Sequence, residues 1–216
     1  MESCSLTPMQ NNATLPSGLT RRRFAALTAG AGLAALVMPR PAMALNTAEA
    51  RGLIDRVVAE LLQIINSGQS EAAMIREFER FFARHADVPI IAQSVLGPPA
   101  RSASRAQMRA FTEAFQGYMA RKYGRRFREF IGGRIEVVDG RQVNQYFEII
   151  STVRIRNERP FELRWLVSDR SGQDRFFNLV IEGVNLLITE RSEIGGMLDR
   201  RGGDIDALIS HLRTVG

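Results

Sequence analysis

The pattern of apolar and polar residues changes its period once along the chain, near Gly133. From residue 47 to that glycine, apolar residues recur every three or four positions, which is the spacing of one face of an α-helix. After the glycine, apolar and charged residues alternate in several short runs, and a period of two is typical of a β-strand with one covered face. The pattern therefore predicts a group of helices followed by an antiparallel sheet.

Three helical segments are expected first. One runs from an N-cap at Thr47 to a stop at Gly68, and the next begins at an N-cap formed by Ser70. The third is short, with Pro89 in its first turn and Gly97 at its end. The apolar stripe of the first segment is wide, so this helix needs cover on more than one side.

The fourth segment is the longest amphipathic helix of the pattern. Ser104 and Gln107 have the spacing of a capping box, and the helix extends to about Tyr123. An aromatic and methionine stripe follows one side of it, formed by Met108, Phe111, Phe115, Tyr118 and Met119. Such a stripe forms the core face of a packed helix, or part of it lines an apolar cavity, because phenylalanine and methionine make an adaptable apolar wall.

Four strands and two closing helices are expected in the rest of the chain. The strands are predicted at residues 135–138, 145–156, 161–168 and 175–182, with turns at residues 139–140, 157–160 and 171–172. One closing helix should start at Thr189 and the other after the Gly202-Gly203 break. We therefore predict an α+β fold, with helices packed on a twisted antiparallel sheet of about four to five strands.

The first 44 residues have the features of an export signal. Residues 20–24 read Thr-Arg-Arg-Arg-Phe, an apolar run covers residues 25–38, and Ala-Met-Ala at residues 42–44 has the pattern of a cleavage site. The alternative is a membrane anchor, but an apolar run of about 14 residues is shorter than the roughly 20 that span a bilayer. We expect residues 1–44 to be a removed twin-arginine signal peptide, and residues 45–216 to form one periplasmic domain.

Composition excludes several classes of site. The only cysteine, Cys4, lies in the expected signal, which rules out cysteine-ligated zinc and iron–sulfur clusters in residues 45–216. The chain has 29 basic and 23 acidic residues, and the expected signal holds four arginines and one glutamate. The remaining 25 basic and 22 acidic residues give a net charge of +3, which is too mild to indicate nucleic-acid binding.

The chain shows no recognisable catalytic arrangement. Its two histidines, His85 and His211, lie in separate segments, and the Gly-x-Ser-x-Gly, P-loop and dinucleotide motifs are absent. Two carboxylates stand out: Asp87 is expected to cap the third helix, and Glu182 to form an ion pair or a backbone hydrogen bond. We predict that the protein is not an enzyme; the alternative is a hydrolase or isomerase that uses one of these carboxylates.

A basic cluster follows the fourth helix. Arg125, Arg126 and Arg128 lie within four residues of one another. They fit a solvated helix end, where cations favour the helix dipole. They also fit a docking surface for anionic lipid headgroups or an acidic partner. The sequence leaves both readings open.

Three stretches resemble the MlaC family, also called the toluene-tolerance family. They are residues 87–97, residues 107–123, and a C-terminal signature formed by Glu-Gly-Val-Asn at 182–185 with residues 191–193 and 203–209. The resemblance covers about residues 48–213. It implies a periplasmic carrier that holds a glycerophospholipid by its acyl chains, with no cofactor.

The resemblance also implies partners and a pocket. Lipid would pass between an outer-membrane lipoprotein complex and an inner-membrane ABC transporter with an MCE-domain ring, with the carrier as a monomer. The predicted pocket wall, between sheet and helices, comprises Val95, Leu96, Phe111, Phe115, Met119, Val153, Trp165, Val167, Phe177, Leu179, Ile181 and Val184.

The sequence departs from the family pattern in two places. Asn185 stands where serine is usual, and residues 174–178 replace a Trp-x-x-Tyr-Asp segment. Because a related branch is associated with hopanoids, a polycyclic triterpenoid is an alternative cargo. A cell-envelope interaction module with a filled core is the alternative from a different functional class.

Overall fold

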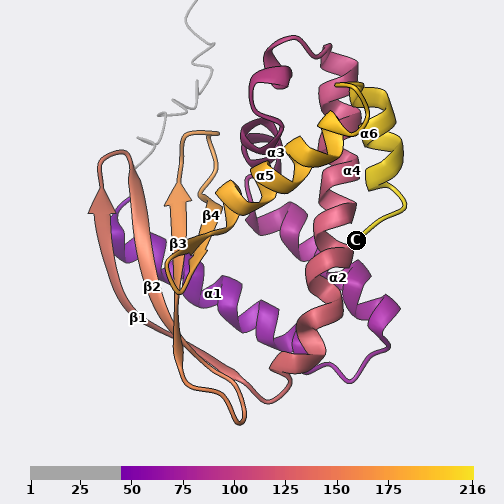
Figure 1. Cartoon of the computed structure of the whole chain (residues 1–216). Coiled ribbons are helices and arrows are strands. Elements are labelled where there is room, and N and C mark those ends of the chain that lie inside the picture. Colours follow the sequence, from indigo (N-terminus) through magenta and orange to yellow (C-terminus); the bar gives the residue numbers. More distant parts are fainter. Residues whose placement is uncertain (1–44) are drawn as a thin grey trace, which may run out of the picture. The chain divides into compact units, whose positions relative to one another are not determined.

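The computed structural model describes residues 45–216, so the predicted twin-arginine signal at residues 1–44 lies outside the described part of the chain. The described residues form six α-helices, two short 3₁₀ helices and a five-stranded antiparallel sheet (Figure 1). The predicted α+β fold is confirmed. Within residues 45–216, no helix is long and apolar enough to cross a membrane.

The first helices begin at polar caps. Their bounds are α1 (Thr47–Ile65), α2 (Glu71–His85), α3 (Val88–Leu96), η1 (Pro98–Arg101), α4 (Arg105–Gly124) and η2 (Arg125–Phe130). The predicted caps at Ser70 and Ser104 are confirmed, and Gln107 completes a capping box with Ser104. The predicted cap at Thr47 is wrong by one residue. Asn46 caps α1, because its side chain accepts from the backbone N–H of Glu49 (3.0 Å) while the Glu49 carboxylate accepts from that of Asn46 (3.0 Å).

Asp87 occupies the N-cap position of α3, but its side chain makes no capping hydrogen bond. Its backbone N–H instead donates to the carbonyl oxygen of Phe176 at 2.8 Å. The start of α3 is therefore attached to the sheet through the main chain.

The strands form a meander in sequence order: β1 (Arg134–Val143), β2 (Tyr146–Arg154), β3 (Phe161–Ser168), β4 (Arg175–Ile181) and β5 (Val184–Asn185). The turn predicted at Asp139-Gly140 is wrong. A register shift between Val137 and Asp139 lets β1 continue, and the chain reverses at Asn144, whose φ is 53°. Asparagine adopts this left-handed conformation more readily than most residues, which suits it to the turn. Asp139-Gly140 has the composition of a turn but lies within a strand, and it was mistaken for the turn.

The two closing helices are α5 (Leu186–Asp199) and α6 (Ile205–Leu212). The predicted start at Thr189 is three residues late, because the side chain of Asn185 accepts from the backbone N–H of Ile188 (3.1 Å) and caps α5. The predicted break at Gly202-Gly203 is confirmed, and both glycines have positive φ.

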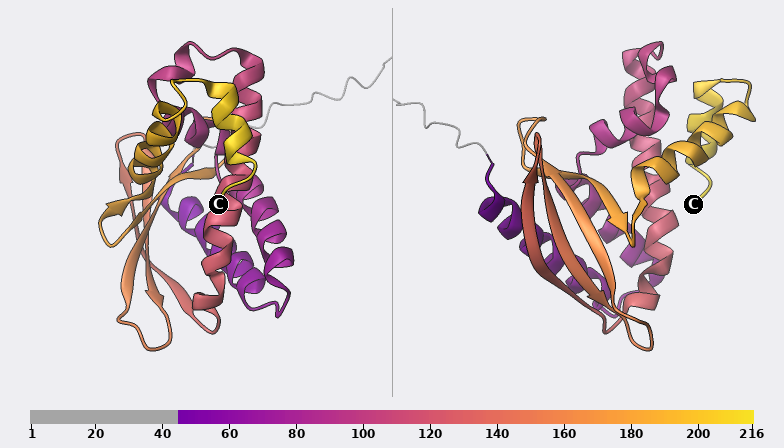
Figure 2. Two further views of the ribbon diagram at one scale, coloured as in Figure 1. Left: turned by 45° about the vertical axis from the view of Figure 1, so that its right-hand side comes forward. Right: turned by 60° about the vertical axis from the view of Figure 1, so that its left-hand side comes forward.

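The twisted sheet lies on one side of this domain, and α2, α4 and α6 lie on the other (Figure 2). Helix α1 packs against β1 and β2, α4 packs against α2 and α6, and α3 packs against α5. Trp165 anchors the sheet: it is only 2% exposed, and its indole N–H donates to the hydroxyl of Ser151 on the neighbouring strand (3.1 Å). Helices α3, α5 and α6 gather at one end of the domain, while η2 and the hairpin between β2 and β3 lie at the other (Figures 1 and 2).

Candidate functional site

An apolar cavity of about 350 Å³ lies between the sheet and the helices. The strands contribute Ile135, Val153, Phe161, Leu163, Trp165, Phe176, Leu179 and Ile181, and Ile155 follows the end of β2. The helices contribute Leu61, Ile65, Phe78, Phe81, Phe82, Met119, Tyr123, Phe127, Phe130 and Leu186. In β3 the lining side chains Phe161, Leu163 and Trp165 alternate along the strand, because a period of two places them on one face of the sheet.

Aromatic side chains form the wall of the cavity on its helical side. The ring of Phe78 stacks on that of Phe81 at 5.8 Å and meets that of Phe127 edge to face at 4.5 Å. Rings packed in this way are held in place, and they offer few hydrogen bonds to water. Because a cavity with apolar walls favours an apolar occupant over water, the space suits an aliphatic or polycyclic hydrocarbon group.

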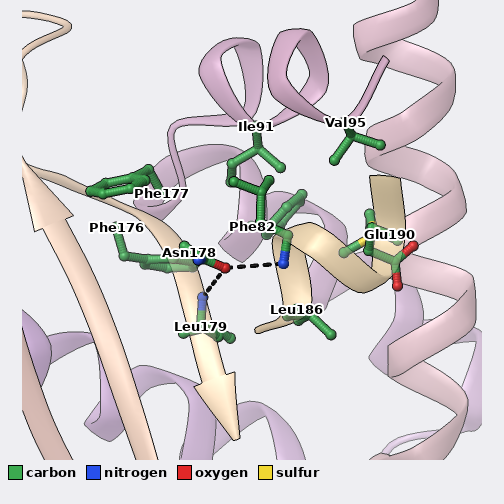
Figure 3. A pocket seen from close by; sticks show the side chains of 11 residues that line it. Phe82, Ile91, Val95, Phe176, Phe177, Asn178, Leu179, Leu186 and Glu190 are labelled. Carbon is green, nitrogen blue, oxygen red and sulfur yellow. Dashed lines mark hydrogen bonds between the residues drawn. The ribbon is translucent and has the colours of Figure 1, made fainter. Parts of the chain in front are cut away.

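A second cavity, of about 30 Å³, lies between β4, α3 and α5 (Figure 3). It shares a group of side chains with the larger cavity: Phe82, Met119, Phe176, Leu179 and Leu186. The side-chain oxygen of Asn178 accepts from the backbone N–H groups of Leu179 (2.8 Å) and Leu187 (3.1 Å), which holds β4 against the start of α5 (Figure 3). Because the five shared side chains line both cavities, they form the partition between them.

Four charged residues line the larger cavity where it opens to solvent: Arg126 and Glu129 of η2, Glu158 of the β2–β3 hairpin, and Glu182 of the turn after β4. All four are exposed, and Arg126 pairs with Glu129 at 3.3 Å. The ion pair predicted for Glu182 is wrong, because its carboxylate makes no ion pair or hydrogen bond with the described residues. Its backbone N–H does donate to the carbonyl oxygen of Glu162 at 3.0 Å, so the hydrogen bond that is present belongs to the main chain and not to the carboxylate. The mouth thus combines an apolar interior with a polar rim.

Seven of the twelve predicted wall residues line one or both cavities. Val153, Trp165 and Ile181 line the larger cavity, Val95 and Phe177 line the smaller one, and Met119 and Leu179 line both.

The others line neither cavity. Leu96, Phe111, Phe115 and Val167 are buried in the core, and Val184 is 58% exposed. The two phenylalanines precede the cavity-lining Met119 and Tyr123 in α4, a helix that packs against α2, α3 and α6. Val184 follows the turn after β4, beyond the covered face.

Sequence reasoning missed the part of the wall that comes from α1, α2 and η2. A signal was present, because Phe78, Phe81 and Phe82 form one stripe of α2. That stripe shows which side of the helix is apolar, but it does not show that the facing sheet stands far enough away to leave a space.

A buried ionic network fastens α5 to α4 beside the smaller cavity. The ammonium of Lys122 contacts the carboxylates of Glu190 (2.7 Å) and Glu193 (2.6 Å). The hydroxyl of Tyr123 donates to Glu190, and that of Tyr118 donates to Glu193 at 3.2 Å. Glu190 is 1% exposed, and its carboxylate points away from the cavity toward α4 (Figure 3). Its Oε2 atom has no hydrogen-bond partner among the described residues.

This network should make the protein sensitive to alkali. Burial raises the pKa of Tyr118 to about 12, and burial with the hydrogen bond to Glu190 raises the pKa of Tyr123. Burial alone lowers the pKa of Lys122, but its hydrogen bonds to Glu190 and Glu193 outweigh this and raise it. Since all three pKa values are higher folded than unfolded, their stabilisation is complete below about pH 10 and is lost as the pH rises further.

We therefore expect the free energy of unfolding, measured by urea denaturation, to fall steadily above about pH 10. The double variant Tyr118→Phe, Tyr123→Phe should show a shallower fall, because two of the three titrating groups are gone. An equally steep fall in this variant would contradict the assignment.

His85 has a structural role. Its Nε2 atom lies 2.7 Å from a carboxylate oxygen of Glu60, which joins α2 to α1. Burial raises the pKa of Glu60, but the hydrogen bonds with His85 and Arg84 outweigh it and lower the pKa. Among residues 45–216, no group of three or more histidine, cysteine, aspartate or glutamate side chains is arranged to hold a metal ion.

Comparison with known proteins gives two results. Residues 55–214 match the family described as MlaC protein. Among solved structures, a similar one is that of the phospholipid-binding protein from Ralstonia solanacearum in complex with a phospholipid. The two chains are 18% identical, the match covers 76% of this chain and 94% of that one, and the TM-score is 0.65, which shows the same fold. Because the family match extends from residue 55 to residue 214, this protein belongs to the MlaC family.

Proposed function

We propose that this protein is a periplasmic carrier that binds a phospholipid by its acyl chains. The observation that carries the proposal is the apolar cavity of about 350 Å³ with its single polar rim. Small-molecule sites in proteins have volumes of about 300–1,000 Å³, so the space is of the right order for a hydrocarbon ligand. Membership of the MlaC family and the phospholipid in the similar Ralstonia structure support the same ligand class.

The energetics of lipid transfer require such a cavity. Two acyl chains hold roughly 28 methylenes, and at about 0.8 kcal/mol each their exposure to water costs on the order of 20 kcal/mol. A soluble carrier must bury these chains almost completely. The headgroup stays in water at the rim, which avoids the cost of removing a charged group from solvent.

The proposal extends to the route. The export signal predicted at residues 1–44 supports a periplasmic location, and the family supports exchange between an outer-membrane lipoprotein complex and an inner-membrane MCE-domain ABC transporter.

The departure from the family pattern at Asn185 has a structural explanation that does not involve the ligand. Its side-chain oxygen caps α5 and accepts from the side-chain amide of Asn178 at 3.0 Å. Serine caps helices in the same way, so this residue supplies no reason to prefer a hopanoid.

Native mass spectrometry with lipid extraction tests the carrier function, on protein exported to the periplasm and purified without detergent. We expect one glycerophospholipid per protein molecule. A triterpenoid at the same stoichiometry would replace the phospholipid by the hopanoid cargo. A protein that is empty, folded and unable to take up lipid from vesicles would contradict the proposal and favour an interaction module.

A further inference from the structure

The end of the domain that carries the cavity mouth is strongly basic. Residues 125–134 and residues 154–159, which we call the basic end, contain seven arginines and two glutamates, a net charge of +5. The whole of residues 45–216 carries only +3, so the rest of this domain has a net charge of −2. The positive charge is therefore concentrated at this end of the domain, on arginines that surround the rim, because the four charged residues that line the mouth itself, Arg126, Glu129, Glu158 and Glu182, sum to −2.

The two segments of the basic end lie next to each other. Arg134 is the direct cross-strand neighbour of Arg154 in the β1–β2 pair. The β2–β3 hairpin and the connection from η2 to β1 occupy the same end of the domain (Figure 1). Like charges placed opposite each other in a sheet are destabilising, so this arrangement opposes folding.

Few acidic side chains neutralise this charge. Among the described residues, Arg126 is the one arginine of the basic end that forms an ion pair, with Glu129. The arginines at positions 125, 128, 154, 156 and 159 are exposed. Their guanidinium groups are free to meet an anionic surface.

Exposed apolar side chains lie close in the sequence to residues that line the cavity. Ile131 is 52% exposed and follows Phe130, which lines the cavity. Val184 and Ile188 are 58% and 65% exposed and lie on either side of Leu186 in the sequence, which also lines the cavity. Arginine with exposed aliphatic side chains is the composition of surfaces that rest in the headgroup region of a bilayer.

We propose that the basic end docks on an anionic lipid bilayer, with the cavity mouth turned toward the membrane. In this orientation an acyl chain moves from the bilayer into the cavity past apolar side chains, while the arginines contact lipid phosphates. This inference rests on the proposed carrier function, because docking serves the exchange of lipid with the membrane. Its test does not depend on that function, because binding to a membrane surface does not require lipid uptake.

Vesicle co-sedimentation provides the test. Wild-type protein should bind vesicles that contain phosphatidylglycerol much better than vesicles of phosphatidylcholine alone. Binding should weaken strongly between about 0.1 M and about 1 M salt, as the Debye length falls from about 10 Å to about 3 Å. Each arginine near an anionic surface contributes about fivefold to binding, so replacing Arg125, Arg128 and Arg156 by glutamine should reduce it on the order of 100-fold.

A matched control comes from the opposite end of α4. Arg101, at the end of η1, and Arg105 and Arg109 of α4 are also exposed. At about 1.5 Å per helical residue, Arg105 and Arg109 lie roughly 24–30 Å from Arg125 along α4. Their replacement by glutamine removes the same charge and should change vesicle binding by less than about threefold. Ile131→Gln, at an exposed site, should weaken binding to anionic vesicles at low and high salt alike.

Two outcomes would overturn the proposal. One is wild-type protein that does not bind anionic vesicles at low salt, in which case the arginines fit an acidic protein surface instead. The other is equal loss of binding in the two triple variants, which would assign the effect to net charge. Vesicle binding without any lipid uptake would support the docking surface and contradict the carrier function, so the two proposals fail separately.

Discussion

Replacement of Leu179 by tryptophan is expected to lower the affinity for lipid by more than 100-fold while the protein stays folded. Leu179 lies in β4 and lines both cavities, so a larger side chain at this position occupies space that the ligand needs. If the indole displaces about four methylenes, about 3 kcal/mol of burial is lost. The ring enters existing space, so the cost to the fold should stay within the 1–3 kcal/mol typical of an enlarged core residue.

The measurement is lipid per protein molecule after purification without detergent, combined with uptake from labelled vesicles. Val138→Trp is the matched control, because this residue is exposed on β1 and lines neither cavity. It should retain normal lipid content. Normal lipid content in Leu179→Trp, or equal loss in both variants, would show that the cavity between sheet and helices is not where the acyl chains bind.

Replacement of Lys122 by methionine is expected to lower the melting temperature by about 6–20 °C. The change leaves Glu190 buried at 1% exposure without its cation. Removing one partner of a buried ion pair destabilises a protein by about 3–5 kcal/mol. In a domain of this size each kcal/mol shifts the melting temperature by about 2–4 °C.

Thermal unfolding followed by circular dichroism at neutral pH measures this effect. Arg125→Met is a suitable control, since it removes an exposed cation one residue beyond the end of α4 and should change stability by less than about 0.5 kcal/mol. Adding Glu190→Gln to Lys122→Met should recover part of the loss, because the uncompensated charge is removed. A small effect of Lys122→Met alone would mean that the Tyr123 hydroxyl or solvent is enough to stabilise the Glu190 carboxylate.

Predictions from the sequence were correct where the interactions join residues close in the chain, and they were wrong where the interactions join residues that are distant in the chain. The caps at Ser70 and Ser104 were predicted because a capping hydrogen bond joins residues three apart. The false turn at Asp139-Gly140 has the opposite origin. The pairing of Gly140 with Ile149 keeps this segment in the sheet, and no local pattern reveals that partner.

The candidate site shows the same division. Val153, Trp165 and Ile181 were predicted as wall residues and line the larger cavity, whereas Val167, two residues after Trp165 in β3, lines neither cavity. Phe111 and Phe115 belong to the same apolar stripe of α4 as Met119, but only Met119 lies at the cavities. A helix that extends past the edge of a sheet meets different neighbours along its length. The periodicity of its sequence does not show where along the helix these neighbours change.

By itself, the sequence determined the types of elements, most of their ends, the α+β class and the family signature. These properties depend on periodicity and on contacts between residues a few positions apart. Only the tertiary structure decided where the apolar faces meet closely and where they leave a cavity, and it placed Arg134 of β1 opposite Arg154 of β2. Both depend on distances between segments that are remote in the chain, and these distances are fixed by the packing of the whole domain.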